Sequence, residues 1–436
     1  METNRHSKND KFHRKTLTVD EARKAVWNRV RHIETVETDL VESIGRRLAE
    51  EVRTREPIPH FRRSGMDGFA VRIEDIVHAS MLNPTELEII EHIPCGKEPV
   101  QNITQGKASR IMTGGMVPDG ANAVIMLEMT EGIIKGDRSY VAIRKPVASG
   151  TNITPIGEEA DIGTLVLRRG QVIEAGQMAL LAALGYSRVK VFQRPKVAIV
   201  STGTELLQVS EPLQRGKIRN SNAYMLAAQI RSAGGKPYLA GQIPDDYARA
   251  ERMIYELLSS DADIIITTGG VSVGDYDIMA DFFMRWEGTT LFNKIAMRPG
   301  SPTSAGLWRD KTNAGLWRDK LLFGLSGNPS ACYVGFELFV RPVLLGMQEA
   351  AEEAVQENTA FLTDDYLKVN AYTRYVRGLR YIQNGMIYVN PVGLDKSSAM
   401  VTIKDANCLI VIPPTKTGIR AGEIVKTIPL KGAMFP

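Results

Sequence analysis

The sequence predicts a multidomain protein of α/β and β architecture: a central doubly wound α/β domain, an inserted β-rich module and a small C-terminal β barrel or sandwich. Three observations predict this fold class. Strand-like and helical segments alternate through residues 195–346, which is typical of a parallel sheet with helices on both faces. Short β-prone runs separated by Gly and Pro turns fill residues 57–154, and similar runs return over residues 360–436.

The N-terminal part of the chain is predicted to hold a divided domain. Residues 1–15 are polar and basic, and we expect a disordered tail there. Thr18 and Glu21 have the spacing of a capping box, so a helix is expected to begin behind them. A second helix is predicted at 174–184, and Gly185 is expected to end it. We therefore predict a helical or mixed domain over 16–56 and 156–193, interrupted by a β-rich domain over 57–155.

The α/β domain is predicted over residues 194–346. Its strands are expected at 196–200, 238–243, 263–268 and 321–325, and its helices at 222–233, at 245–258, from 277 onward and up to about 345. In such folds ligands bind at the carboxyl ends of the strands, where the loops converge. Residues 347–359 are expected to be an acidic linker, and residues 347–436 as a whole to form the C-terminal β domain.

A tandem repeat lies inside the α/β domain. The stretch AGLWRDKTN at 305–313 is followed at once by AGLWRDK at 314–320, a period of nine residues. A shift by an odd number of residues would turn every side chain to the opposite face if both copies lay in one strand. We therefore expect one copy to be looped out between two strands.

Composition excludes several classes of protein. The chain has 436 residues, 54 basic and 50 acidic side chains and a net charge of +4, spread along the sequence, so nucleic acid is not an expected partner. The apolar runs are too short to span a membrane. The three cysteines lie far apart, which fits a reducing cytoplasm. All six histidines fall within the first 92 residues, so the rest of the chain offers no imidazole for a triad or a zinc site.

Four loops that follow predicted strands are the candidate binding elements. They are STGTEL at 201–206, the acidic pair at 245–246, TTGGVSVGDYD at 267–277 and LSGNP at 325–329. Glycines let the backbone approach a ligand, and helix N-termini direct N–H groups at anions. The candidate substrate-binding residues in these loops are Thr202, Gly203, Gly269, Gly270, Ser272, Gly274, Ser326, Gly327, Asn328 and Pro329.

The same loops carry acidic side chains. Clustered carboxylates need a cation, and oxygen ligands favour Mg²⁺. A simpler interpretation is that first-turn acids only complement helix dipoles and that Asn222 and Asn328 only cap helices. Lys294 and Arg298 follow a further strand and could pair with an anion, or could be a solvated surface pair. The acidic residues concerned are Glu205, Asp245, Asp246, Asp275 and Asp277.

Six segments resemble one known family. SGMDGFAV, RIMTGG, STGTEL, TTGGVSVGDYD, FNKIAMRPGSP and LSGNPSACYVGFEL occur in this order and look like those of the MoeA-like molybdopterin molybdenumtransferases, to which the C-terminal region of gephyrin also belongs. The similarity extends from about residue 18 to the C-terminus. It implies a homodimer of four-domain subunits and Mg²⁺-dependent insertion of molybdate into adenylylated molybdopterin, with release of AMP. The enzyme that adenylylates molybdopterin is a further partner that the resemblance suggests.

The resemblance also implies roles for individual residues. Asp67 and Thr113 would face the active site from the partner subunit, while Glu205, Asp245 and Asp277 would act as catalytic and metal-contacting acids. Lys294 would be a catalytic cation on the molybdate side, and Pro329 would shape its loop. Arg377 and either Ser397 or Ser398 would contribute from the C-terminal domain.

The chain departs from the family pattern at three positions. Glu159 stands where the family has Asp, so a longer carboxylate would face the substrate. Arg298 stands in a loop that is rich in lysine in some members, and a guanidinium still holds an oxyanion. Ser326 stands where some members have Pro.

Two other functions remain open from the sequence. One is a non-catalytic molybdopterin-binding or scaffold protein that uses the same fold for self-association; the acidic residues at the loop ends argue against a purely structural role. The other is a nucleotide-dependent oxidoreductase, which only the Gly-rich loops suggest. The third loop lacks the spacing of a dinucleotide-binding fingerprint.

Overall fold

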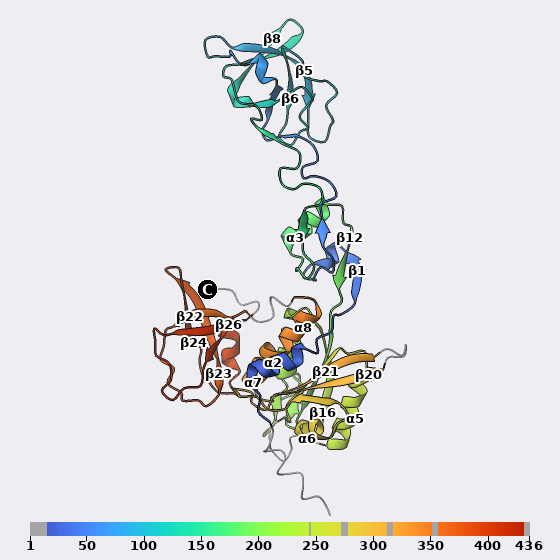
Figure 1. Ribbon diagram of the computed structural model, residues 1–436, viewed down its shortest axis with the longest axis vertical. Coiled ribbons are helices and arrows are strands. Elements are labelled where there is room, and N and C mark those ends of the chain that lie inside the picture. The colour runs from blue at the N-terminus through green and yellow to red at the C-terminus, as the bar shows by residue number, and fades with distance from the viewer. Residues whose placement is uncertain (1–14, 244–245, 272–277, 312–316, 351–355, 431–436) are drawn as a thin grey trace, which may run out of the picture. The chain divides into compact units, whose positions relative to one another are not determined.

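The computed structural model describes residues 15–243, 246–271, 278–311, 317–350 and 356–430 (Figure 1). The chain divides into two compact units. The main unit comprises Met1–Glu50, Arg169–Met178 and Ser187–Pro436, and the inserted unit comprises Glu51–Arg168 and Ala179–Tyr186. The boundaries of the four domains expected from the sequence stay a prediction.

The inserted unit is built on a six-stranded sheet with the order β7-β4-β6-β5-β9-β8. Two clusters of buried apolar side chains pack against this sheet. One includes Phe69, Leu87 and Val141, and the other includes Ile93, Ile111 and Val124. Two short antiparallel pairs, β2 with β11 and β3 with β10, complete the unit. The elements are β2 (Val52–Arg53), β3 (Arg63–Ser64), β4 (Gly68–Val71), η2 (Ile73–Asp75), β5 (Thr85–Ile93), β6 (Lys107–Ile111), β7 (Ala123–Met126), η3 (Leu127–Met129), β8 (Thr130–Lys135), β9 (Arg138–Ile143), β10 (Ile153–Thr154) and β11 (Leu165–Leu167).

The N-terminal helix of the main unit begins as its sequence predicts. In α2 (Val19–Trp27) the Thr18 Oγ1 accepts a hydrogen bond from the Glu21 N–H at 3.2 Å, and Glu21 Oε2 accepts one from the Thr18 N–H at 2.7 Å. The turn η1 (Val41–Ser43) follows β1 (Thr35–Asp39), which pairs antiparallel with β12 (Arg188–Phe192). Helix α3 occupies Ala175–Ala183.

The α/β domain has a six-stranded sheet with the order β16-β13-β17-β21-β20-β18. The first four strands of this order are parallel, and β20 and β18 add an antiparallel edge. The predicted doubly wound fold is therefore confirmed. The elements are β13 (Lys196–Thr202), β14 (Leu206–Leu207), β15 (Ile218–Arg219), α4 (Asn222–Ser232), β16 (Lys236–Ile243), α5 (Tyr247–Leu258), β17 (Ile264–Thr268), α6 (Ile278–Arg285), β18 (Thr289–Phe292), β20 (Ser304–Lys311), β21 (Trp317–Leu325), α7 (Pro329–Gly335), η4 (Phe336–Val340) and α8 (Arg341–Met347).

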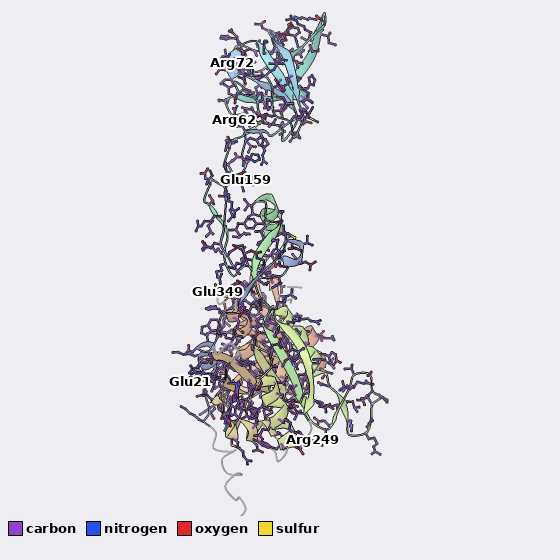
Figure 2. The ribbon with its side chains drawn as sticks, turned by 90° about the vertical axis from the view of Figure 1, so that its right-hand side faces the viewer. Glu21, Arg62, Arg72, Glu159, Arg249 and Glu349 are labelled. Atoms are coloured by element: carbon purple, nitrogen blue, oxygen red, sulfur yellow. The ribbon has the colours of Figure 1, made fainter. Side chains whose placement is uncertain are left out.

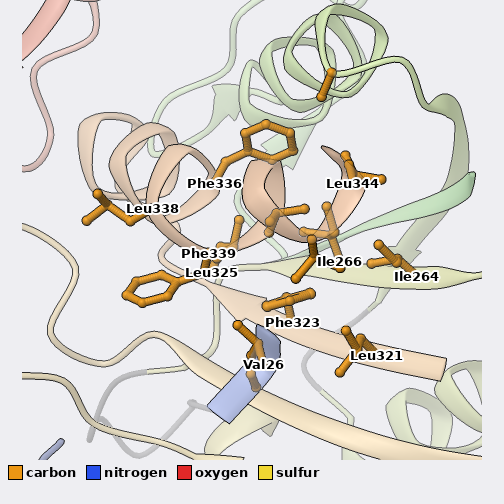
Figure 3. Packing of buried hydrophobic residues seen from close by; sticks show 14 of the residues in the cluster. Val26, Ile264, Ile266, Leu321, Phe323, Leu325, Phe336, Leu338, Phe339 and Leu344 are labelled. Carbon is orange, nitrogen blue, oxygen red and sulfur yellow. The ribbon is translucent and has the colours of Figure 1, made fainter. Parts of the chain in front are cut away.

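Alternate residues of the central strands enter two separate cores. Ile264, Ile266 and Phe323 point to the face covered by α2, α4 and the α7–η4–α8 segment (Figure 3). Ile265 and Leu322 point to the opposite face, where α5 and α6 pack. Because side chains of a strand alternate between faces, the centre of a strand that is buried on both sides must be apolar, as Ile264–Ile266 and Leu321–Phe323 are.

The segment Pro329–Met347 is long and apolar enough to cross a membrane by length and composition. It has 19 residues and a mean hydropathy of 1.3, but 94% of the window is buried inside the protein. Phe336, Phe339 and Leu344 of this segment belong to the core beside α2 (Figure 3). The segment is therefore a core helix, and no membrane span is indicated among the described residues.

The C-terminal domain is a closed five-stranded barrel, which resolves the expected choice between barrel and sandwich. Its strands pair in the ring β23-β24-β22-β26-β25, because β25 also pairs with β23. The short β19 (Met297–Arg298), from the preceding domain, adds to this barrel beside β23. The elements are β22 (Asn358–Leu362), β23 (Thr373–Gln383), β24 (Met386–Pro391), η6 (Val401–Asp405), β25 (Cys408–Ile412) and β26 (Ile424–Pro429).

The expectation that one repeat copy is looped out was wrong. Residues 305–311 of the first copy lie in β20 and residues 317–320 of the second copy lie in β21, so the described parts of the two copies pair antiparallel within the ladder from Ser304↔Gly324 to Lys311↔Trp317. The odd shift has no effect on the faces because the copies lie in different strands. Antiparallel pairing also places Arg309 opposite Asp319, and their side chains form an ion pair at 3.3 Å.

Candidate functional site

The loops at the carboxyl ends of β13, β17 and β21 enclose a cavity of about 540 Å³. This is the edge at which ligands bind in doubly wound folds. The cavity lies wholly within the main unit, and polar residues and glycines form most of its lining. The sequence-predicted residues that line it are Thr202, Gly203, Glu205, Gly269, Gly270, Ser326, Gly327, Asn328 and Pro329.

Close backbone packing explains the glycines of this edge. Gly269 has φ +104°, and a Cβ there would lie 2.8 Å from the carbonyl oxygen of Thr202. A Cβ on Gly327 would lie 3.4 Å from the Cα of Gly269, so the loops after β17 and β21 also touch. A side chain at Gly269 would therefore collide with Thr202 and push the loops after β13 and β17 apart. The glycines therefore shape the cavity as well as allowing its turns.

Asn222 is a site residue that the sequence analysis described only as a helix cap. It is the first residue of α4, whose N-cap is Ser221, and only 8% of it is exposed. Its Nδ2 donates to Thr268 Oγ1 and to the Gly327 carbonyl oxygen, both at 2.9 Å. Thr268 Oγ1 in turn donates to the Ser326 carbonyl oxygen at 3.1 Å. One amide thus joins three walls of the cavity.

Other lining residues also went unnoticed in the sequence. The cavity lining includes Leu206 and the run Ile218, Arg219, Asn220 and Ser221, which consists of the short β15 and the two residues between it and α4. The signal that could have identified them is the pair of polar residues, Asn220 and Ser221, directly ahead of α4. Asn328 does occupy the N-cap of α7, but within the described residues its side chain makes no capping hydrogen bond.

Only part of the predicted acidic group can be located. Glu205 is exposed at the cavity, whereas Asp245, Ser272, Gly274, Asp275 and Asp277 lie outside the described residues. Asp246 caps α5 by accepting a hydrogen bond from the Arg249 N–H at 2.9 Å, as the simpler interpretation expects. Among the described residues no group of three potential metal ligands occurs. The oxygen donor of Glu205 nevertheless has the chemistry that Mg²⁺ prefers.

Lys294 and Arg298 do not line the cavity. Lys294 lies half-buried between β18 and β19, and its carbonyl oxygen accepts a hydrogen bond from the Leu17 N–H at 3.1 Å. Arg298 is exposed in β19, beside the barrel strand β23. Arg298 therefore lies where the α/β domain meets the barrel, whereas Lys294 contacts the segment just ahead of α2.

Arg377 is hydrogen-bonded to a residue next to a loop that lines the cavity. It is 2% exposed, and its guanidinium donates to Ser330 Oγ, to the Leu394 carbonyl oxygen at 2.7 Å and to Thr402 Oγ1 at 3.1 Å. Ser330 directly follows Pro329, and its N–H donates to the Ser397 carbonyl oxygen at 3.0 Å. Burial lowers the pKa of the Arg377 guanidinium from its ordinary value. Arg377 and Ser397 therefore contact the loop that carries the lining residues.

The inserted unit brings two of the predicted residues together. Asp67 Oδ1 accepts hydrogen bonds from the Thr113 N–H at 2.6 Å and from Thr113 Oγ1 at 2.9 Å. These bonds, the backbone one first, hold the pKa of the Asp67 carboxyl below its ordinary value. Glu159 lies in the same unit (labelled in Figure 2), and its carboxylate pairs with Arg63 at 2.9 Å. Thr113 thus keeps an exposed carboxylate ionised.

Three family descriptions match successive parts of the chain. The MoeA N-terminal region (domain I and II) matches residues 17–185, a probable molybdopterin binding domain matches 198–346, and the MoeA C-terminal region (domain IV) matches 359–430. Together they cover the inserted unit, the α/β domain with its cavity, and the barrel.

Relatives match over nearly the whole length. The chain is 42% identical to the molybdopterin molybdenumtransferase of Bacillus subtilis (strain 168), over 95% of this chain and 94% of the relative. It is 39% identical to the enzyme of the same name from Staphylococcus aureus (strain Mu50), over 95% and 96% of the two chains. The crystal structure of the molybdopterin biosynthesis MoeA protein from Pyrococcus horikoshii OT3 superposes with a TM-score of 0.78 at 31% identity, covering 95% of this chain and all of that one.

Proposed function

The chain belongs to the MoeA family of molybdopterin molybdenumtransferases, transferases of molybdenum cofactor biosynthesis, and from this premise we propose the reaction that its cavity serves. The proposed reaction is Mg²⁺-dependent insertion of molybdate into adenylylated molybdopterin, with release of AMP. The main support is the polar cavity of about 540 Å³, which lies where the glycine loops of β13, β17 and β21 converge. A phosphate-bearing substrate suits such an edge because the loop backbones can approach it closely.

The loop residues have binding and positioning roles in this proposal. The backbones of Gly203, Gly269 and Gly327 approach the substrate, and Asn222 fixes the spacing of the loops that present them. Glu205, with Asp245 and Asp277, would supply oxygen ligands to Mg²⁺, which when bound offsets charge on the phosphate oxygens. Lys294 and Arg298 would hold molybdate as an oxyanion, although neither side chain lines the cavity. Positioning and electrostatics, with no protein nucleophile, would supply most of the rate.

The site is proposed to need residues from two subunits. Asp67 and Thr113 would reach the cavity from the partner subunit of a homodimer, together with Glu159. Support comes from the ionised state of Asp67, since a fixed carboxylate is suited to orienting a cationic or hydrogen-donating group. We further propose that the enzyme is cytoplasmic and receives its substrate from the molybdopterin adenylyltransferase.

AMP release tests the proposed reaction. Purified protein is mixed with adenylylated molybdopterin, and AMP is measured with and without molybdate and Mg²⁺. We expect release only when both are present. Glu205→Gln should reduce the rate at least about a hundredfold. The substitution removes a negatively charged ligand of the Mg²⁺ that is proposed to offset charge on the phosphate oxygens. The matched control is Glu256→Gln, an exposed glutamate of α5 that lies outside the cavity lining and should leave the rate unchanged.

Other outcomes would change the proposal. Tight binding of the substrate without AMP release would indicate a molybdopterin-binding scaffold, and absence of binding would contradict the proposed substrate. A normal rate in Glu205→Gln would remove that carboxylate from the mechanism. Replacing molybdate by tungstate in the same assay measures the preference between the two oxyanions.

A further inference from the structure

A second cavity lies at the opposite edge of the α/β sheet. It has a volume of about 690 Å³, and its lining includes Arg46, Arg194, Arg231 and Lys236, with Glu42 as the acidic member. Lys236 begins β16, and Arg194 comes two residues before β13. Both strands run from this edge toward the substrate cavity, so the two cavities lie at opposite ends of the sheet. No residue lines both.

The positive charges around this cavity lack carboxylate partners. Within the part of the chain that the structure describes, none of the four cations forms an ion pair. Neighbouring cations differ: Arg188 lies 3.6 Å from Asp39, and Lys196 pairs with Asp261. The chain therefore neutralises basic side chains around this cavity but not those that line it.

Arg46 is the best-anchored member of the group. Its Nη2 donates to the Phe192 carbonyl oxygen at 2.8 Å, which fixes the guanidinium half-buried at the cavity. Burial lowers the pKa of Arg46 from its ordinary value, and the positive charge of Arg194 lowers it further. Four cations that form no ion pair repel one another where they line one cavity, and a bound anion would offset that repulsion.

From this arrangement we infer an anion-binding site that takes a compact, multiply charged oxyanion such as pyrophosphate. Guanidinium groups bind phosphate-type oxyanions through paired N–H donors, and a site of this volume accommodates a small molecule. The lining contains Thr38, Gly235 and Pro237 but no aromatic side chain, so it offers nothing on which a nucleobase could stack. The inference does not depend on the proposed reaction at the other edge.

Isothermal titration calorimetry of the whole protein with pyrophosphate tests the inference. Separate titrations with inorganic phosphate and with molybdate identify which oxyanion the site takes. We expect binding that weakens as salt increases. In Arg194→Gln/Arg231→Gln the affinity should fall about tenfold, because each exposed guanidinium contributes one modest charge-assisted contact. Both side chains are exposed, so the variant should fold normally.

The matched control removes the same charge elsewhere. Arg249→Gln/Arg252→Gln replaces two exposed arginines of α5 that are absent from both cavity linings, and it should bind as the unmodified protein does (Arg249 is labelled in Figure 2). An equal loss in both variants would mean that only net charge matters, and would overturn the site. Binding unaffected by Arg194→Gln/Arg231→Gln would mean that the oxyanion binds elsewhere on the protein, and would overturn the site too. Failure of all three oxyanions to bind would do the same.

Discussion

At the scale of single residues, Asp67 and Thr113 show how a local contact sets a charge state. Thr113 presents two donors to one carboxylate oxygen, and both stabilise the ionised form. Asp67 is therefore a carboxylate at neutral pH and is unsuited to donating a proton. Any role that it has in the reaction would be electrostatic or orienting.

Replacing the Thr113 hydroxyl should raise the pKa of Asp67. In Thr113→Val the backbone N–H donor remains, so the pKa should move only part of the way back to 3.8. A lowered folded-state pKa stabilises the fold above the unfolded-state pKa, and this stabilisation is lost as the pH falls through the folded value. The variant should therefore be less stable at neutral pH, and the difference should shrink as the pH falls below 3.8 and vanish once the pH is below the lowered pKa of Asp67.

Carboxyl carbon NMR during a pH titration measures this pKa, and urea unfolding at two pH values measures the stability. The control is Thr104→Val, which alters an exposed threonine of the same unit and should leave the pKa of Asp67 unchanged. An unchanged pKa in Thr113→Val would mean that the hydroxyl does not stabilise the carboxylate.

At the scale of secondary structure elements, the β20–β21 hairpin carries the repeat away from the substrate cavity. Lys311 and Trp317 form its outermost pair, whereas Leu325 ends β21 at the cavity edge. Eight residue steps of about 3.3 Å separate Trp317 from Leu325, or about 26 Å along the strand. The extension therefore lies far from the loops proposed to bind substrate.

Deleting residues 309–317 should leave the enzyme active. The deletion removes one copy and joins Trp308 to Arg318, which leaves the two-residue loop Arg318–Asp319 between the paired Trp308 and Lys320. The register from Ser304↔Gly324 to Trp308↔Lys320 is kept. Because Arg and Asp are poor residues for a two-residue turn, we expect a loss of about 1 kcal/mol or less in unfolding free energy. AMP release and urea unfolding measure the two effects, and a large fall in activity would mean that the repeat acts on the cavity.

Elements defined by local pattern could be predicted, and contacts between distant residues could not. Alternating strands and helices located the cavity loops, and the Thr18 capping box located the start of α2. The side-chain amide of Asn222 hydrogen-bonds Thr268 and Gly327, which lie 46 and 105 positions further along the chain. Such long-range contacts cannot be predicted from the periodicity of the sequence. The hairpin was mispredicted because each repeat copy was weighed as part of one strand.

At the scale of the whole molecule, the candidate residues are divided between two units. Glu205 and the glycine loops belong to the main unit, while Asp67, Thr113 and Glu159 belong to the inserted unit. The proposed homodimer would bring the main unit of one subunit to the inserted unit of its partner. In that arrangement each of the two sites is incomplete in a single chain.

Subunit complementation tests this arrangement. Asp67→Ala and Glu205→Ala should each be nearly inactive, yet coexpressing them should restore about a quarter of the normal AMP release. Random pairing makes half of the dimers mixed, and each mixed dimer has one of its two sites intact. The matched control coexpresses Glu205→Ala with Lys294→Ala, both in the main unit, where no mixed dimer regains a complete site. If each site were built within one chain, the Asp67 pair would recover no more activity than the control pair, even though mixed dimers formed.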